Sequence, residues 1–156
     1  MDFDSDGGRD YRVSDVDNWL SNTYYGYLDT AIANSIPTVA TVYLYASYNV
    51  TRKVFLFSEI ELGLSMDSAF PEEGTLIPYF SSNTLRKMYI SGSSTARIWW
   101  TRRRGLSGSD VYAVKDDGTG RSYYPGDSYY VLPAFNLSGT TMVSLTTDID
   151  GCYTLM

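Results

Sequence analysis

The stretch Ile98-Trp99-Trp100-Thr101-Arg102 decides the fold, because it predicts an aromatic β-strand in the C-terminal half of the chain. Adjacent strand residues point to opposite faces, so one tryptophan is expected to face the core and its neighbour the other side. We expect the inward tryptophan to be a core anchor and the outward one to tolerate substitution. An Asp117-Gly118 turn downstream predicts that a hairpin extends the same sheet.

Further strands are predicted around this one by period-two patterns, and two helical patterns precede them. The first helix is expected to run from its Ser14 cap to Leu20, and the second over residues 27–36, ended by Pro37. A long excursion over residues 64–94 shows little periodicity. Strands are expected at residues 38–46, 53–57, 97–103, 110–115, 121–124, 129–137, 141–146 and 152–155, with turns at 48–51 and 150–151. The fold class is therefore α+β: two early helices, a mostly antiparallel twisted sheet and a long loop excursion.

Composition indicates one domain and excludes several kinds of chemistry. The 156 residues, 44% of them hydrophobic, are enough for one core and too few to suggest two, so residues 1–156 are taken as a single domain with residues 1–11 as a leading loop. No apolar run is long enough to span a bilayer, so no membrane insertion is expected. Histidine is absent and Cys152 is the only cysteine, which excludes an internal disulfide and a cysteine-rich metal cluster.

Charge and aromatic content favour a binding surface. A net charge of −6 opposes a polyanionic partner, so nucleic acid is not expected. The 15 tyrosines, with many Ser and Gly, are typical of binding loops, and Tyr also suits half-buried strands. The arginine run at 102–104 is interpreted either as a solvated turn edge or as a partner contact. The predicted interaction surface comprises Trp100, Arg102, Arg103, Arg104, Tyr112, Tyr123, Tyr124, Tyr129 and Tyr130.

The acidic start has the spacing of the front half of a calcium loop. Asp2, Asp4 and Asp6 precede a glycine at alternate positions, which lets oxygen ligands converge on a hard cation. Val13 stands where that loop needs a bidentate carboxylate. These three aspartates are therefore weak calcium candidates, and no cofactor is predicted.

Catalytic groups are not indicated by any spacing in the chain. The acids at Glu59, Glu61 and residues 72–73 are interpreted as solvated or helix-starting charges. A nucleophile paired with a base, or a carboxylate pair in a cleft, would be needed to indicate turnover. The chain is therefore predicted not to be an enzyme.

The aromatic strand, the hairpin turn and the later stretch Tyr130-Val131-Leu132-Pro133-Ala134-Phe135-Asn136-Leu137 together resemble the end of an uncharacterised family of bacterial and phage domains. That family is similar in fold to C-type lectins, to the sulfatase-modifying (formylglycine-generating) enzymes and to variable receptor-binding proteins of phages. Its first helix is similar to residues 14–20, and its strand leading into a second helix is similar to residues 53–63. The family commonly has Arg where this chain has Leu132. The resemblance covers most of residues 10–137 and implies a C-type-lectin-like fold.

What this resemblance implies about function is binding. We expect a non-catalytic binding or adhesion module of a phage virion or bacterial surface assembly, located on the virion or at the cell surface. The expected partners are a protein or glycan receptor, other virion or surface subunits, and copies of the chain itself. The alternative is a purely structural virion protein, a capsid decoration or tail component that self-assembles, and the third candidate is an enzyme of unfamiliar type. Related domains have one or two strands before the first helix, so the sequence is expected either to be a piece of a longer chain or to take that strand from a neighbour.

Overall fold

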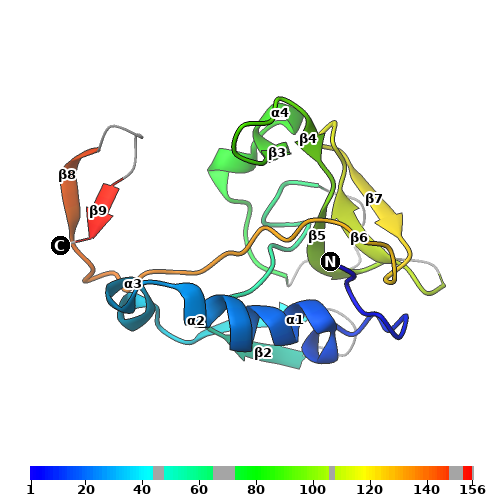
Figure 1. Cartoon of the computed structure of the whole chain (residues 1–156), viewed down its shortest axis with the longest axis horizontal. Coiled ribbons are helices and arrows are strands. Elements are labelled where there is room, and N and C mark those ends of the chain that lie inside the picture. The colour runs from blue at the N-terminus through cyan, green and yellow to red at the C-terminus, as the bar shows by residue number, and fades with distance from the viewer. Residues whose placement is uncertain (44–47, 65–72, 106–107, 148–152, 156) are drawn as a thin grey trace.

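Strand β5 (Trp99–Arg104) is the central element of the fold, with a neighbouring segment hydrogen-bonded on each side (Figure 1). The computed structural model describes residues 1–43, 48–64, 73–105, 108–147 and 153–155. β5 pairs antiparallel with β6 (Val111–Val114), and β6 pairs with β7 (Gly120–Tyr123). On its other side, β5 forms a parallel bridge from Trp99 to Tyr130. The sequence correctly predicted these three strands and the turn between β6 and β7.

The remaining elements are short. Among the described residues, three further antiparallel ladders join β1 (Val39–Tyr43) with β2 (Tyr48–Arg52), β3 (Met88–Tyr89) with β4 (Ala96–Arg97), and β8 (Val143–Thr147) with β9 (Tyr153–Leu155). The helical segments are η1 (Tyr11–Val13), α1 (Asp15–Trp19), the π-helical η2 (Leu20–Tyr24), α2 (Tyr25–Tyr27), α3 (Thr30–Ser35), η4 (Pro78–Phe80) and α4 (Asn83–Arg86). This confirms the α+β class and its antiparallel sheets. No helix in the described part of the chain is long and apolar enough to cross a membrane.

The first helix is longer than predicted, and the second is shorter. Ser14 caps α1 through its hydroxyl, which accepts from the Asp17 amide at 3.1 Å, as the sequence indicated. The helix then continues through η2 and α2 to Tyr27. It ends at Leu28, whose backbone is extended, and the Asp29 carboxylate caps α3 by accepting from the Ala31 amide at 2.8 Å. The break therefore falls inside the segment for which one helix was predicted.

Both faces of β5 are buried, which corrects one prediction. Trp100 belongs to a core with Phe3 and Val16 from the N-terminal region, while Trp99 belongs to a second core with Leu62 and Phe80. Both tryptophans are 0% exposed. Their side chains do alternate between faces, but neither face is open to solvent, so the prediction of one tolerant tryptophan is wrong.

Several predicted strands are single bridges or have moved. Residues 129–137 run beside β5 and then exchange two backbone hydrogen bonds between Ala134 and Phe55, at 2.8 and 2.9 Å. Residues 53–57 accordingly form no strand of their own, and β2 occupies the predicted turn at 48–51. Residues 44–47 of the first predicted strand, residues 65–72 of the excursion, the turn at 150–151 and Cys152 lie outside the described residues.

The long excursion has structure where it is described, because one buried arginine holds it in place. Arg86 at the end of α4 donates to the carbonyl oxygens of Leu62 (2.9 Å), Phe80 (2.7 Å) and Gly118 (3.0 Å). These bonds join the excursion to the β6–β7 turn. Gly118 has a φ of +84°, and a Cβ there would overlap the Asn83 carbonyl of α4, so the turn and the helix pack closely.

Candidate functional site, a polar cleft beside the first helix

Four members of the predicted interaction surface are buried. Trp100 is 0% exposed, Arg102 and Arg103 are 1% exposed, and Tyr112 is 4% exposed. The physical reason is that β5 and β6 lie between the two cores, so their side chains have no open face. These four residues cannot contact a partner at the surface, and the interpretation of the arginine run as a solvated turn edge is wrong for Arg102 and Arg103.

The arginines are buried because each meets a glutamate. Arg102 binds Glu61 through two parallel bonds of 2.8 and 2.9 Å and also donates to the Leu56 carbonyl oxygen at 2.6 Å. Arg103 forms an ion pair with Glu59, which is itself fully buried. Ser58 and Glu61 bond each other reciprocally, amide to side chain, at 2.8 and 3.1 Å. Glu59 and Glu61 are therefore structural partners of β5, which corrects their interpretation as solvated charges.

The other five predicted surface residues remain candidates. Tyr124 and Tyr130 are exposed, at 54% and 40%, while Arg104, Tyr123 and Tyr129 are half-buried. The structure brings two of them together, because the rings of Tyr123 and Tyr129 pack edge to face with centroids 4.8 Å apart. A role for these five residues in partner binding stays a prediction.

The acidic start is used within the fold. Asp2 accepts a hydrogen bond from the Ser128 hydroxyl, and Asp4 accepts from the Asp6 amide at 3.1 Å. The segment also pairs with the end of β7, since the Phe3 amide donates to the Pro125 carbonyl oxygen at 2.8 Å. Within the described residues, no cluster of three or more His, Cys, Asp or Glu side chains could hold a metal ion.

A polar cleft of 620 Å³ lies between the first helix and strand β2, where the sequence analysis did not place a site. Its volume falls in the range of small-ligand sites, about 300–1,000 Å³. Eleven of its thirteen lining residues have polar side chains. The cleft is lined by Arg12, Val13, Ser14, Asp17, Asn18, Ser21, Asn22, Tyr25, Thr38, Thr51, Arg52, Lys53 and Val54.

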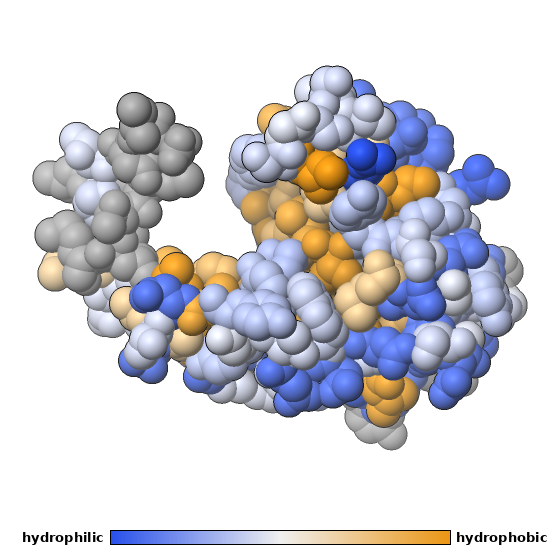
Figure 2. All heavy atoms as spheres, viewed as in Figure 1, coloured by the Kyte–Doolittle hydropathy of each residue, from blue (hydrophilic) through white to orange (hydrophobic). Residues whose placement is uncertain are grey.

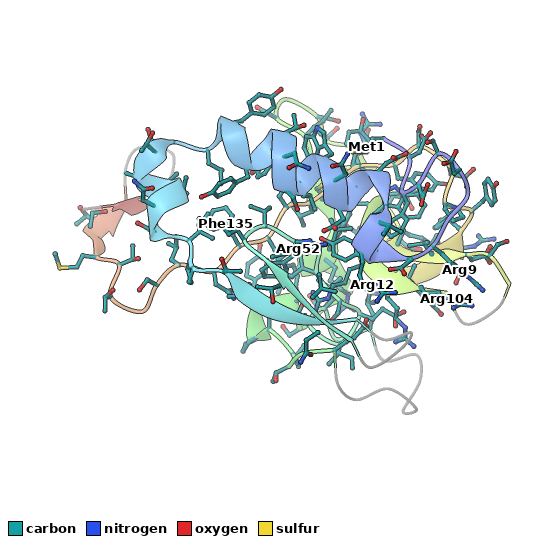
Figure 3. All side chains as sticks on the ribbon, turned by 90° about the horizontal axis from the view of Figure 1, so that it is seen from below. Met1, Arg9, Arg12, Arg52, Arg104 and Phe135 are labelled. Carbon is teal, nitrogen blue, oxygen red and sulfur yellow. The ribbon has the colours of Figure 1, made fainter. Side chains whose placement is uncertain are left out.

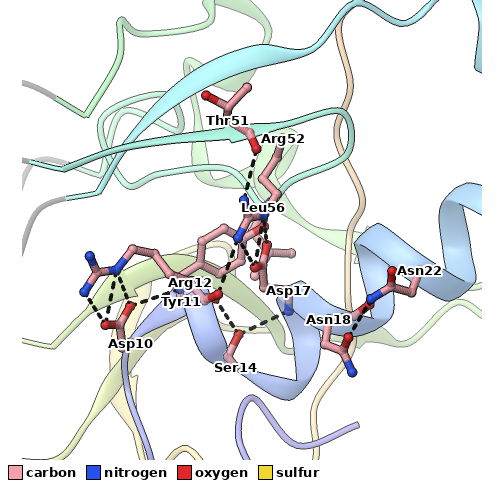
Figure 4. A network of polar contacts seen from close by, with 10 residues as sticks. All are labelled: Asp10, Tyr11, Arg12, Ser14, Asp17, Asn18, Asn22, Thr51, Arg52 and Leu56. Atoms are coloured by element: carbon pink, nitrogen blue, oxygen red, sulfur yellow. Dashed lines mark hydrogen bonds and ion pairs between the residues drawn. The ribbon is translucent and has the colours of Figure 1, made fainter.

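Two ion pairs hold the walls of the cleft in position (Figure 4). Arg52 of β2 donates to both carboxylate oxygens of Asp17 on α1, at 2.6 and 2.8 Å, and so ties the strand to the helix. Arg12 pairs in the same way with Asp10, at 2.5 and 2.9 Å. In the view from below, Arg12 lies between Arg52 and Arg104 (Figure 3).

These pairs also shift the ionisation of their members. The hydrogen bond from Arg12 holds the pKa of the Asp10 carboxyl below its ordinary value. The hydrogen bond to Asp17 raises the pKa of the Arg52 guanidinium. Both shifts favour the charged forms of Asp10 and Arg52, the forms that make these hydrogen bonds.

The remaining polar groups of the cleft lie around Tyr25. Lys53 donates to the Tyr25 hydroxyl oxygen at 2.7 Å, and that hydroxyl donates to the Ala33 carbonyl oxygen at 3.1 Å. Asn22 donates to the Asn18 side-chain oxygen at 2.6 Å. This arrangement supplies several hydrogen-bond donors and acceptors to the cleft.

Part of the helical wall of the cleft, around Ser21 and Asn22, is π-helical. In η2 the Tyr25 amide donates to the Leu20 carbonyl oxygen, five residues earlier. Such wide turns are frequent at functional sites. The sequence contained the Ser14 cap and the polar residues that follow, but hydrophobic periodicity does not reveal a π-turn or identify the strand that packs beside it.

Comparison with known families identifies the chain. Residues 4–139 match the family described as a domain of unknown function, DUF6273, and because this match covers most of the chain, the protein belongs to that family. No curated protein and no solved structure matches it. Strands β8 and β9 lie outside the matched range.

Proposed function

We propose that this DUF6273 domain is a non-catalytic binding module that recognises its partner through the polar cleft between the first helix and β2. The expected setting is a phage virion or a bacterial surface assembly, where the module would bind a receptor, a glycan or a neighbouring protein. This setting, and a C-type-lectin-like version of the α+β fold, are proposed from the sequence resemblance. The early helix and the aromatic strand β5 support the proposed fold.

The observation that carries this proposal is the rigidity of a concave, polar surface. Arg52 is fixed by Asp17, and Arg12 by Asp10, so neither wall needs to order itself when a ligand enters. Binding sites gain affinity from such preorganisation, because less side-chain entropy is lost on association. The apolar support below the cleft is also firm, since Tyr11 and Val54 are buried there.

The test is to measure binding of the purified domain to a glycan array and to bacterial envelope fractions. The variant Asn18→Ala/Asn22→Ala changes two exposed residues of the cleft and should leave the fold intact, so it reports on the site itself. Lys115→Gln, beside the turn after β6, is the control, because Lys115 lines neither the cleft nor the apolar pockets near α4. Loss of binding by the double variant, with binding retained by the control variant, supports the proposal. Binding by the double variant as tight as that of the control would exclude the cleft as the site.

A purely structural role is the second candidate, because an apolar hollow lies on another part of the surface. Two pockets of 400 and 380 Å³ share Phe57 and Pro133 below α4, and Figure 2 shows hydrophobic residues gathered there. The nearby Tyr79 and Tyr89 are exposed. Exposed apolar patches of this kind mark contact sites between proteins. The β8–β9 hairpin stands away from the rest of the molecule (Figure 1).

The molar mass of the domain in solution separates the two candidates. A self-assembling protein should form multimers whose mass falls to that of the monomer in Tyr79→Ser/Tyr89→Ser. Light scattering after size-exclusion chromatography measures this directly. A monomer that still binds glycans or envelope fractions supports the binding module, and a multimer without such binding supports the structural candidate.

A further inference from the structure

Lys53 gives the cleft a positive charge, although the whole chain is negatively charged. Three cations line the cleft, and two of them are neutralised by carboxylates: Arg12 by Asp10 and Arg52 by Asp17. Among the described residues, Lys53 has no carboxylate within ion-pair distance of its ammonium group, and its hydrogen bond goes to the neutral hydroxyl of Tyr25. The cleft therefore carries an excess positive charge in a chain of net charge −6.

The ammonium group of Lys53 is held in place and still has donors to offer. It lies 4.8 Å from the centroid of the Tyr25 ring and uses one of its three N–H groups on the Tyr25 hydroxyl. Two N–H groups remain for a ligand. A fixed cation with spare donors suits a carboxylate, because charge-assisted hydrogen bonds are about twice as strong as neutral ones.

The helical wall of the cleft offers both hydrogen-bond donors and acceptors to a ligand, on side chains one helical turn apart. The Asn22 side-chain amide donates to the Asn18 side-chain oxygen at 2.6 Å and to the Asn18 backbone carbonyl oxygen at 3.2 Å. This leaves the Asn22 side-chain oxygen as an acceptor and the Asn18 amide group as a donor for other partners. Neighbouring hydroxyl groups of a sugar, which both donate and accept, match such a pair.

We propose that the cleft binds an acidic saccharide, with its carboxylate on Lys53 and its hydroxyl groups on Asn18 and Asn22. This inference rests on the proposed binding function and narrows it to one class of ligand. The two uncharged wall residues favour a saccharide over an acidic peptide, because a peptide carboxylate would satisfy Lys53 without using them.

The experiment compares three probes by isothermal titration calorimetry: a galacturonic acid trimer, its methyl ester and a peptide of three glutamates. The wild-type domain should bind the acid at least tenfold more tightly than the ester or the peptide. Lys53→Gln should weaken acid binding about tenfold and leave ester binding unchanged, whereas Lys53→Arg should keep the preference for the acid. Asn18→Ala/Asn22→Ala should weaken acid and ester equally. Lys115→Gln, which removes the same charge at a residue that lines neither the cleft nor the apolar hollow, should behave as wild type.

The outcomes separate this inference from the function on which it rests. Equal affinity of the wild type for acid and ester, or unchanged acid binding in Lys53→Gln, would overturn the acidic-saccharide assignment while leaving a cleft that binds neutral glycans. Tighter binding of the peptide than of the saccharide would overturn it in favour of a protein ligand. If no probe binds and Asn18→Ala/Asn22→Ala also leaves envelope binding unchanged, both the inference and the proposed site fail.

Discussion

Replacing either tryptophan of β5 by alanine tests the two-sided core directly. Trp99 and Trp100 are each fully buried, in different cores. A buried tryptophan withdraws about 200 Å² from water, which at about 25 cal/mol per Å² is worth about 5 kcal/mol. Part of this area is already hidden in the unfolded chain, so we expect a loss of about 3–5 kcal/mol for each variant, the usual range for a deleted buried aromatic.

Each indole also donates a hydrogen bond that alanine cannot replace. The Trp99 ring nitrogen donates to the Arg86 carbonyl oxygen, and that of Trp100 to the Met1 carbonyl oxygen, both at 3.1 Å. Trp99→Phe and Trp100→Phe keep most of the apolar volume and remove these bonds. They should therefore lose less stability than the alanine variants, by an amount that measures the packing contribution alone.

Urea unfolding followed by far-UV circular dichroism gives the free energies without relying on tryptophan fluorescence. Trp19→Ala is the matched control, because Trp19 is only partly buried and packs at the margin of one core. Trp19→Ala should lose clearly less free energy of unfolding than either β5 variant. If Trp99→Ala or Trp100→Ala unfolds at the same urea concentration as Trp19→Ala, the corresponding face of β5 is not a packed core.

Three further predictions concern the ionisation of Tyr11, the turn at Gly118 and the acidic start of the chain. Burial raises the pKa of the Tyr11 hydroxyl, so its contribution to stability is complete below the ordinary tyrosine value of about 10 and is lost as pH rises above it. The free energy of unfolding should therefore fall less steeply with alkaline pH in Tyr11→Phe than in wild type. Tyr27→Phe, at an exposed tyrosine, is the control. Gly118→Ala should lower the melting temperature more than Gly92→Ala, because both have positive φ but only the first would place a Cβ against α4; equal losses would contradict the close packing of that turn. Removal of divalent cations with a chelator should leave the melting temperature unchanged, because the carboxylates of residues 2–6 bond within the fold, and a drop reversed by calcium would contradict this.

Local patterns predicted the elements that depend on short-range chemistry. The Ser14 cap, the strands near Trp100 and the turn at Gly118 follow from hydrogen-bonding side chains, alternation and a positive φ, all of which act between residues close in sequence. Predictions failed where a distant segment decided the outcome. The stretch around Tyr130 is extended as expected, yet it forms only single bridges, because its partner changes from β5 to Phe55 along its length.

The interaction surface was misplaced for a related reason. A run of arginines predicts solvent exposure unless the matching acids are known, and Arg102 meets Glu61 across 41 residues of sequence. The cleft was missed because its walls come from Asp17 and Arg52, which are 35 residues apart and meet only when β2 packs beside the helix. No periodicity in one segment indicates such a pairing.

By itself, therefore, the sequence determined the α+β class, the aromatic strand at Trp99 and Trp100 and the absence of histidine, because these follow from composition and local periodicity. Only the tertiary structure decided which charges are buried and which line a surface. Arg103 and Lys53 are both cations on or beside strands, yet the first is enclosed with Glu59 and the second faces a cleft. The difference arises because packed cores cover both faces of β5, whereas Lys53 lies at the edge of the cleft. Such packing depends on distant segments and cannot be predicted from local sequence.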